Sequence, residues 1–360
     1  MKRREFIKKT GAGGLLAGSL IAVAPAVHAG TKIKWKMVTT WPKNFPGLGT
    51  GANNLARLIT EMSGGRLRVK VYGAKELVPA FEVFDAVSRG TAQMGHGAAY
   101  YWKGKVSAAQ FFAAVPFGMN AQEMNAWLYY GGGEKLWQDL YQPFNIIPTA
   151  AGNTGVQMGG WFNKEINSVS DLKGLKMRIP GLGAEVLKRA GGTPVSLPGG
   201  EIYTSLQSGA IDATEWVGPY NDLAFGLYKA AKYYYYPGWH EPGSVLEALI
   251  NQNAYAGLPR DLQSIVMNAC KIVNADMLAE YTARNNAALH TLVNKHKVQL
   301  RPFPDDVLKK LAQLSEVVVK EVAAKDQHAH KIYQSFHNFR KQAMAWGKIS
   351  EQAFLRAREL

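Results

Sequence analysis

The sequence contains a single cysteine, Cys270, among its 360 residues. A disulfide within the chain, a cysteine-based zinc site and an iron–sulfur cluster each need more than one thiol, so none of them can be built. Charged residues are also scarce, at 19 % of the chain against 47 % hydrophobic residues. This balance supplies a large buried core and excludes wholesale disorder. A chain of this length has room for roughly two domains.

The sequence also lacks the short motifs of the common catalytic sites. It has no His-Glu-x-x-His, no Gly-x-Ser-x-Gly, no P-loop and no dinucleotide-binding glycine pattern after a predicted strand. His328 and His330 lie in a charged helical stretch, which is typical of a solvated helix face. Cys270 lies on the apolar face of a predicted helix, where we expect it to be buried and unreactive.

The first residues have the pattern of an export signal. Basic residues in Met1–Lys9 precede an apolar, glycine-rich stretch, Gly11–Val27, that is too short for a membrane span of about 20 residues. Small residues around Ala29 suit cleavage by a signal peptidase. Arg3–Lys8 resembles a twin-arginine signal, with an ordinary secretory signal as the alternative. We therefore expect residues 1–29 to be removed on export.

Basic residues outnumber acidic residues by 42 to 27, which gives a formal net charge of +15. A basic exported protein can bind nucleic acid or a membrane surface, or its charge can simply favour solubility. The lysines and arginines are scattered along the chain, with no basic stripe and no nucleic-acid motif. The sequence therefore predicts no nucleic-acid partner.

The first part of the mature chain alternates strands with helices. Residues 32–40 alternate apolar and polar side chains as a strand does, and residues 52–62 follow the period of an amphipathic helix. A second strand at 67–71 completes a strand–helix–strand unit, which implies a parallel pair. A short helix at 80–89 and a strand at 93–96 follow. These residues predict an α/β lobe.

A second α/β series and a helical end follow. The expected strands of this series are 146–149, 155–161, 176–179 and 211–216, and its expected helices are 183–190 and 201–207. A long strand at 245–251 is expected to cross back between the lobes. Beyond Pro259 the expected elements are the helices 262–295, 305–324, 332–346 and 350–358. The sequence thus predicts two lobes that are each discontinuous in the chain.

Three segments contain the residue types of a binding site. Asn153–Trp161 combines two amide side chains with three glycines, which let a backbone approach a ligand closely; a structural turn is the alternative. Arg178 alternates with apolar residues on a short predicted strand, and its guanidinium suits a carboxylate; a surface arginine is the alternative. Glu215 lies in an apolar run, where a carboxylate needs a cation or a donor. An acid with backbone and amide oxygens can bind Na⁺ or Ca²⁺, and a simple pair with an arginine is the alternative.

Two aromatic runs, Tyr100–Trp102 and Tyr233–Glu241, complete the candidates. Phenol and indole rings wall a pocket while keeping a hydrogen-bonding group at their tip. Packing in the core is the alternative for most of these rings.

Together these segments resemble the DctP-type substrate-binding proteins of the tripartite ATP-independent periplasmic (TRAP) transporters, over nearly the whole chain. The segments that carry the resemblance are Asn153–Trp161, Arg178, Asp212–Tyr220 and Tyr233–Glu241. They are most similar to the subgroup that binds 2-oxo acids or lactate together with a cation. The resemblance implies a periplasmic protein that captures a small monocarboxylate, such as pyruvate or lactate, and delivers it to membrane permease subunits. No organic cofactor is implied, and an exported enzyme acting on small organic acids is the alternative.

The resemblance also implies roles for single residues. Arg178 corresponds to the arginine that binds the substrate carboxylate. The other expected substrate contacts are Asn153, Gln157, Tyr100, Tyr101 and Trp216. The expected ligands of Na⁺ or Ca²⁺ are Glu215, Gln157 and the backbone of Trp216, with Glu241 as a fourth candidate. Gly181-Leu182-Gly183 and His240 depart from the family's pattern and leave the identity of the acid open.

The implied fold is the α/β fold of two-lobed periplasmic binding proteins, with crossing hinge strands, a long connecting helix and a C-terminal helical extension. Lobe I is expected at residues 30–152 plus about 247–285, lobe II at 153–246 plus about 286–314, and the extension at 315–360. The predicted helices of the extension carry a broad apolar face that must be buried. The resemblance favours a homodimer with exchanged terminal helices, and packing on the chain's own lobes is the alternative.

Overall fold

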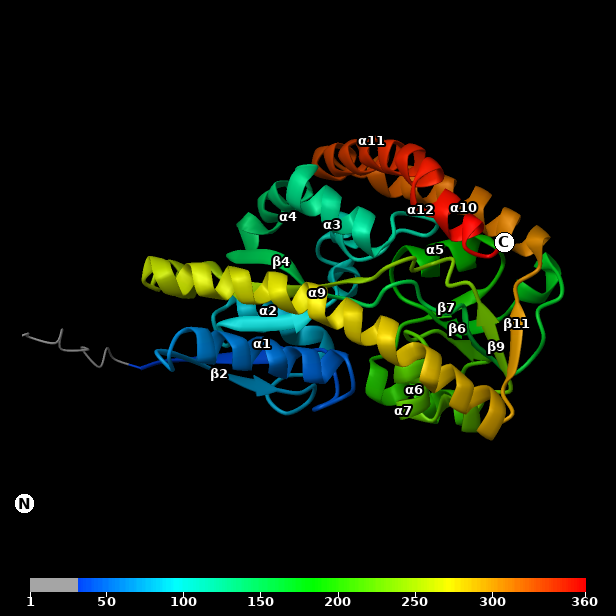
Figure 1. The fold of residues 1–360 in the computed structure, drawn as a ribbon, viewed down its shortest axis with the longest axis horizontal. Helices are drawn as coiled ribbons and strands as arrows, with labels where there is room; N and C mark the ends of the chain where they lie inside the picture. Colours follow the sequence, from blue (N-terminus) through cyan, green and yellow to red (C-terminus); the bar gives the residue numbers. More distant parts are fainter. Residues whose placement is uncertain (1–31) are drawn as a thin grey trace, which may run out of the picture.

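The computed structural model describes residues 32–360 (Figure 1), and the expected signal sequence lies outside the described residues. The strands are β1 (Ile33–Thr39), β2 (Leu67–Tyr72), β3 (Met94–Gly97), β4 (Ile146–Asn153), β5 (Gly160–Phe162), β6 (Lys176–Arg178), β7 (Thr193–Val195), β8 (Ala213–Thr214), β9 (Tyr233–Tyr236), β10 (Val245–Asn251) and β11 (Gln299–Pro302). The α-helices are α1 (Leu48–Met62), α2 (Val83–Ser88), α3 (Ala121–Tyr130), α4 (Gly133–Tyr141), α5 (Gly181–Arg189), α6 (Gly199–Gln207), α7 (Pro219–Phe225), α8 (Gln252–Ala256), α9 (Arg260–His290), α10 (Asp305–Ala323), α11 (Gln327–Ile349) and α12 (Glu351–Ala357). Two 3₁₀ helices, η2 (Ala99–Trp102) and η3 (Ser107–Phe112), connect β3 to α3.

The strands form two mixed sheets. The first has the order β2-β1-β3-β10-β4, in which β1 is parallel to β2 and β3, and β10 is antiparallel to β3 and β4. The second has the order β11-β9-β5-β8-β6-β7, in which β5 is antiparallel to β8 and β9, and β6 is parallel to β7 and β8. We call the first sheet with its helices lobe I and the second lobe II. The two-lobed α/β fold is therefore confirmed, whereas the residue boundaries of the lobes stay a prediction.

Two connections and one long helix join the lobes. The chain passes from β4 to β5 and returns from β9 to β10. The Thr154 amide donates to the Ser244 carbonyl (3.1 Å) and the Ser244 amide donates to Thr154 Oγ1 (3.2 Å), which ties the two connections together. Helix α9 packs on α1 and β4 of lobe I and on α7 of lobe II (Figure 1). Helix α9 is the predicted connecting helix. The strand expected to cross between the lobes, 245–251, is β10 and lies within the sheet of lobe I, so the segment before it makes the crossing.

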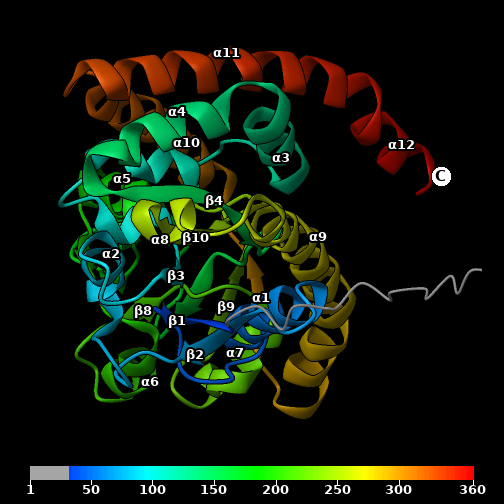
Figure 2. The same ribbon diagram turned by 90° about the vertical axis from the view of Figure 1, so that its left-hand side faces the viewer.

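The C-terminal helices α10 and α11 run over the side of the molecule opposite to α1 and α7 (Figures 1 and 2). Helix α10 packs on α5, and α11 packs on α3, α4 and η3. Their inner faces are buried against the chain's own lobes through Val307, Leu311, Val318, Ile332 and Phe336. Beyond them, Trp346, Ile349 and Phe354 are 68 %, 71 % and 64 % exposed. The chain therefore covers only part of the predicted apolar face.

The structure shortens two expected strands and adds three. Of the strand expected at 211–216, only Ala213–Thr214 form β8. Of the strand expected at 155–161 only the end forms β5, and the residues before it are a loop. The reason is that the amides of Gln157 and Met158 donate to the carbonyls of Glu241 and Val217, which lie beyond the ends of β9 and β8, so no regular ladder continues. The strands β7, β9 and β11 were not expected, because each has only three or four residues.

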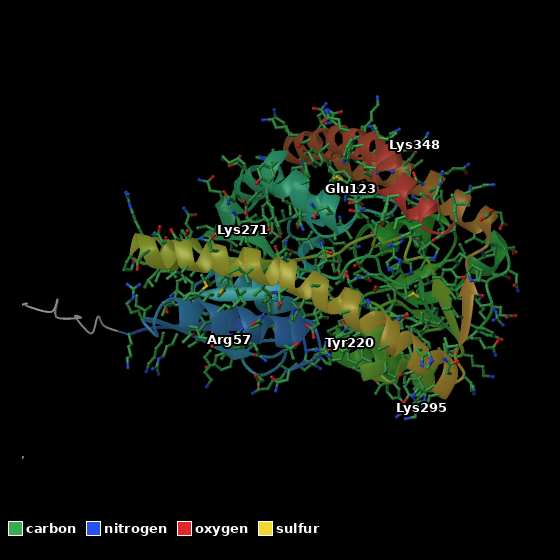
Figure 3. All side chains as sticks on the ribbon, viewed as in Figure 1. Arg57, Glu123, Tyr220, Lys271, Lys295 and Lys348 are labelled. Carbon is green, nitrogen blue, oxygen red and sulfur yellow. The ribbon has the colours of Figure 1, made fainter. Side chains whose placement is uncertain are left out.

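Charged side chains lie on the outer faces of the helices, as Arg57 of α1, Lys271 of α9 and Lys348 of α11 show (Figure 3). These basic side chains belong to separate elements and do not form one stripe. Within residues 32–360, no helix is both long enough and apolar enough to cross a membrane.

Candidate functional site

Strand direction brings the lobe II candidates to one edge of their sheet. Because β6 and β8 are parallel, Arg178 at the end of β6 and Glu215 just after β8 lie at the same edge. Strand β5 is antiparallel to β8, so the loop that precedes it, with Gln157, also lies there. Strand β9 is antiparallel to β5 and leads into the segment of Glu241 at the same edge. The carboxyl ends of parallel strands are where open α/β sheets bind ligands.

Lobe I presents the facing edge. Strand β3 leads into η2, which carries Tyr100 and Tyr101, and β4 has the same direction as β3 and ends at Asn153. The lobes meet closely: a Cβ added to Gly181 of α5 would lie 3.1 Å from Tyr100 Cβ. Arg178 Nη2 donates to the Tyr101 hydroxyl at 3.4 Å. The cleft between the two edges is therefore closed.

Arg178 is only 2 % exposed and is bonded on several sides, so the surface alternative is wrong. Its Nε donates to the Leu197 carbonyl (3.1 Å), and its Nη1 donates to the Glu215 carbonyl (3.4 Å) and forms an ion pair with Glu215 Oε1. The guanidinium carbon lies 5.1 Å from the centre of the Trp216 ring. Burial lowers the pKa of Arg178, but Glu215 and the two tyrosines raise it more, so the group stays charged. This ion pair is the alternative that the sequence left open. A ligand that binds Arg178 or Glu215 must therefore share or replace this contact.

Glu215, His240 and Glu241 form a buried cluster whose possible ligand atoms lie within 4.8 Å of one another. His240 Nε2 lies 3.4 Å from Glu215 Oε2, and Gln157 Nε2 donates to Glu241 Oε2 at 2.8 Å. Burial, and then the charge of Glu215, raises the pKa of Glu241 well above the usual range of a carboxyl group. Both acids can therefore be ionised together only when a further positive charge lies beside them, and a bound cation would supply that charge.

Three of the predicted site residues, and also His240, each have one buried polar atom with no hydrogen-bond partner among residues 32–360. These atoms are Gln157 Oε1, Asn153 Nδ2, His240 Nδ1 and Trp216 Nε1. Buried polar groups of folded proteins almost always have partners. An unpaired amide oxygen suits a cation, whereas amide and indole N–H groups suit the oxygens of an anion. The unpaired atoms therefore suit a cation and an anion that bind together.

The spacing of the acidic cluster also fits a metal ion. Ca²⁺ lies about 2.3–2.6 Å from its oxygen ligands, so two oxygens that share one ion lie within about 5 Å. The carboxylates of Glu215 and Glu241 meet that limit. Carboxylate and amide oxygens are the ligands that hard cations prefer. The residues present thus fit Na⁺ or Ca²⁺.

The structure adds residues that the sequence did not assign to the site. Trp41 and Phe45 of lobe I pack against Trp216, with ring centroids 6.3 Å apart in each pair. Thr154 Oγ1 accepts from Gln157 Nε2 at 3.2 Å and so positions that amide. The available signal for Trp41 was its place just beyond a predicted strand, at the carboxyl end where contacts with ligands are common. No comparable signal marks Phe45 or Thr154.

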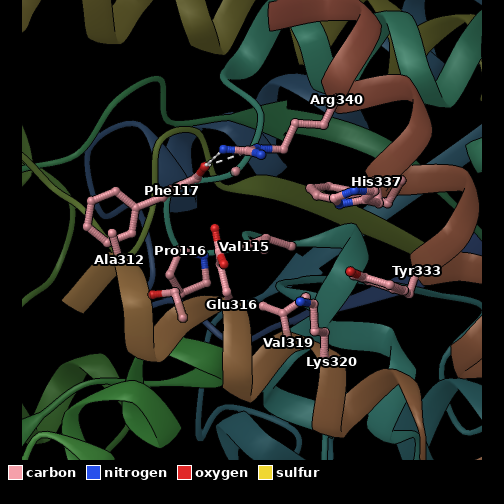
Figure 4. A pocket seen from close by; sticks show the side chains of 13 residues that line it. Val115, Pro116, Phe117, Ala312, Glu316, Val319, Lys320, Tyr333, His337 and Arg340 are labelled. Carbon is pink, nitrogen blue, oxygen red and sulfur yellow. Dashed lines mark hydrogen bonds between the residues drawn. The ribbon is translucent and has the colours of Figure 1, made fainter. Parts of the chain in front are cut away.

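A cavity of about 320 Å³ lies away from this cluster, between α10, α11 and the segment Val115–Gly118 (Figure 4). Arg340 of α11 donates to the Phe117 carbonyl from Nε (3.1 Å) and Nη2 (2.8 Å), which fastens α11 to lobe I. This cavity is lined by none of the predicted site residues.

Comparison with known proteins agrees with this geometry. The family model described as bacterial extracellular solute-binding protein, family 7 (DctP), matches residues 37–326. The monocarboxylate 2-oxoacid-binding periplasmic protein of Nostoc sp. is 45 % identical in an alignment of 359 residues that covers 98 % of each chain.

Solved structures of TRAP solute-binding proteins are similar along most of the chain. The protein of Pseudoalteromonas atlantica with bound sodium and pyruvate has 45 % identity and a TM-score of 0.88, over 90 % of this chain and 99 % of that one. The protein of Colwellia psychrerythraea with bound calcium and pyruvate has 46 % identity and a TM-score of 0.88, over 91 % and 99 %. The protein of Bordetella bronchiseptica, a dimer with calcium and picolinate, has 36 % identity and a TM-score of 0.89, over 91 % and 97 %.

Proposed function

The chain belongs to family 7 of the bacterial extracellular solute-binding proteins, the DctP family of TRAP transporters, and we propose that it captures a small monocarboxylate together with Na⁺ or Ca²⁺. The proposed ligand is a 2-oxo acid such as pyruvate, or a 2-hydroxy acid such as lactate. The observation that carries the proposal is the buried cluster beside Arg178, with its two acids and its unpaired amide and indole atoms.

The organic acid meets a set of donors in the cleft. Its carboxylate suits the guanidinium of Arg178, because charge-assisted bonds to a carboxylate are strong and directional. Asn153 Nδ2 and Trp216 Nε1 are buried donors without partners among the described residues, and they suit the remaining oxygens. Tyr100 and Tyr101 cover the site from lobe I, so the ligand would be enclosed when the lobes close.

The cation meets oxygen atoms on the other side of the cluster. Glu215, Glu241, Gln157 Oε1 and the Trp216 carbonyl are its proposed ligands. When bound, the ion supplies positive charge that offsets the two acids and allows an anion to bind beside them. Without the ion, the raised pKa of Glu241 means that its carboxyl keeps a proton. The ion would allow Glu241 to ionise and to serve as a ligand.

Mass spectrometry of the ligand released from freshly purified protein, with metal analysis alongside, tests the proposal. We expect a 2-oxo or 2-hydroxy monocarboxylate and about one equivalent of sodium or calcium. A dicarboxylate, a sugar or an amine as the released ligand would contradict it.

The alternative, an exported enzyme that acts on small organic acids, predicts turnover. We propose that the protein is a receptor and not an enzyme, because the cluster lies at the lobe boundary of a family of binding proteins. Incubation with pyruvate or lactate should therefore leave the acid unchanged, and steady consumption of either acid would favour the enzyme.

We further propose that the protein acts in the periplasm as a homodimer and delivers its ligand to TRAP permease subunits. Exposed Trp346, Ile349 and Phe354 at the end of the C-terminal helices support the dimer, since such a cluster of large apolar groups marks an interaction surface. The dimer of the Bordetella bronchiseptica protein supports it as well. Light scattering of the mature protein at micromolar concentration tests this assembly.

A further inference from the structure

The hydrogen bonds that Arg178 already makes exclude a bidentate contact with a substrate carboxylate. A guanidinium has five N–H groups. Nε uses its single N–H on the Leu197 carbonyl, and Nη1 uses both of its N–H groups on the carbonyl and the carboxylate of Glu215. Nη2 uses one on the Tyr101 hydroxyl, so a single N–H remains. A carboxylate that binds in the bidentate mode needs two adjacent N–H groups.

Glu215 is therefore the group that prevents bidentate binding of a substrate carboxylate by Arg178. Its carboxylate already makes with Nη1 the contact that a substrate carboxylate would make. Leu197 offers a fixed backbone carbonyl to Nε, whereas the Glu215 side chain can turn about its own bonds. Glu215 Oε2 also faces His240 and belongs to the cluster that fits a cation.

We propose that the Glu215 carboxylate pairs with Arg178 in the cation-free protein. When the cation binds, the Glu215 carboxylate becomes its ligand, and the N–H groups of Arg178 become available to the substrate. This inference rests on the proposed function and adds a mechanism of coupling to it. The cation would then have two effects: it contacts the acid, and it exchanges the partner of Arg178. One ligand changes the affinity for another only if it stabilises one state of the protein more than the other state. Here the two states are Glu215 paired with Arg178 and Glu215 bound to the cation.

The proposal separates two roles of Glu215 that otherwise look alike. If Glu215 were only a cation ligand, a variant without it would have the same low affinity for the acid as the wild type has without cation. If Glu215 also blocks Arg178, its removal improves acid binding in the absence of cation. The expected order of pyruvate affinity is wild type with calcium, then Glu215→Ala with or without calcium, then wild type without calcium.

Calorimetry with pyruvate tests this order in sodium-free, chelated buffer and in saturating calcium. We expect the wild type to differ between the two buffers by about 5- to 150-fold, the usual range of coupling between two ligands. We expect Glu215→Ala to differ by less than about threefold, well below that range. Glu215→Leu, which has a similar volume and no hydrogen-bond acceptor, should behave in the same way and serves if the alanine variant does not fold. Glu201→Gln is the matched control, since Glu201 pairs with exposed Lys75 and should keep the wild-type dependence.

A second measurement needs no substrate. The ¹⁵N-labelled arginine side chains report the partners of Arg178, and the Arg178→Lys spectrum identifies its signal. Calcium alone should shift this signal in the wild type and leave it in place in Glu215→Ala.

Two results would overturn the inference. One is a folded Glu215 variant that binds pyruvate no better than the wild type does without cation. The other is an Arg178 signal that calcium does not move. A wild type that binds no pyruvate even in calcium contradicts the proposed function itself, which is a separate outcome.

Discussion

The Tyr101 hydroxyl and Arg178 Nη2 lie 3.4 Å apart although the two residues belong to different lobes. Tyr101 follows β3 of lobe I, and Arg178 ends β6 of lobe II. This contact can exist only when the lobes are closed, and it covers the guanidinium that is proposed to bind the substrate. Opening and closing of the lobes would therefore control access to Arg178.

Replacement of Arg178 by lysine should weaken acid binding. Arg178→Lys keeps the positive charge but loses the planar fork, so we expect a loss of about 2 kcal/mol or more in the free energy of pyruvate binding. Titration calorimetry measures it. Arg57→Lys on the exposed face of α1 is the control and should bind as the wild type does. Undiminished affinity in Arg178→Lys would remove Arg178 from the site.

Removal of the cation should abolish the stabilisation that the acid gives. A ligand that binds only the folded protein raises its melting temperature, and we expect pyruvate to do so with calcium or sodium present but much less in chelated, sodium-free buffer. Thermal unfolding at fixed pyruvate concentration, with and without each cation, measures the effect. An equal shift in all buffers would show that Glu215 and Glu241 are structural acids.

Glu247 should make the stability of lobe I depend on pH. It is fully buried on β10, where it accepts a hydrogen bond from Trp102 Nε1, and burial raises the pKa of its carboxyl to about 8. Between about pH 5 and about pH 8 the unfolded chain loses this proton while the folded chain keeps it. The free energy of unfolding should therefore fall as the pH rises, by up to about 1.4 kcal/mol per pH unit from this group.

The variant Glu247→Gln cannot ionise and should flatten this decline. Melting temperatures of the variant and the wild type, measured across the same pH range, give the comparison, with Glu201→Gln at an exposed position as the control. Parallel curves for Glu247→Gln and the wild type would show that Glu247 does not control the dependence.

The C-terminal end should control assembly. Deletion of residues 332–360 would also remove Ile332 and Phe336, which belong to the chain's own core, so a surface variant is the sharper test. Trp346→Glu with Phe354→Glu should give monomers that keep the wild-type affinity for pyruvate. Light scattering and calorimetry check the two halves of this expectation, and an unchanged dimer would place the interface elsewhere.

Much of the fold follows from local sequence pattern. The apolar alternation of β1 and the helical period of α1 are properties of neighbouring residues, so they could be predicted. The helices from α9 to α12 could be predicted for the same reason, because their apolar positions repeat over many turns. Strands β7 and β11 are held by pairing with distant segments, β6 and β9, and pairing of this kind leaves no local pattern.

For the site, the residues could be predicted from the sequence, but the contacts between them could not. Arg178 and Glu215 were identified as polar residues in apolar surroundings, Gln157 as an amide in a glycine-rich segment, and all three through the family resemblance. The structure brings them together. The ion pair itself was only one of the alternatives, since the distance between residues 37 positions apart depends on the packing of β6 against β8. The packing of Trp41 and Phe45 against Trp216 depends on closure of the lobes, which no local pattern records.

The central claim is that the protein binds a small 2-oxo acid together with a cation, and calorimetric titration of ligand-free protein with pyruvate tests it most directly. In saturating calcium or sodium we predict saturable binding of one pyruvate per chain, and in chelated, sodium-free buffer a much weaker binding. Absence of pyruvate binding in every buffer, from protein that is shown to be folded and free of its own ligand, would contradict the account.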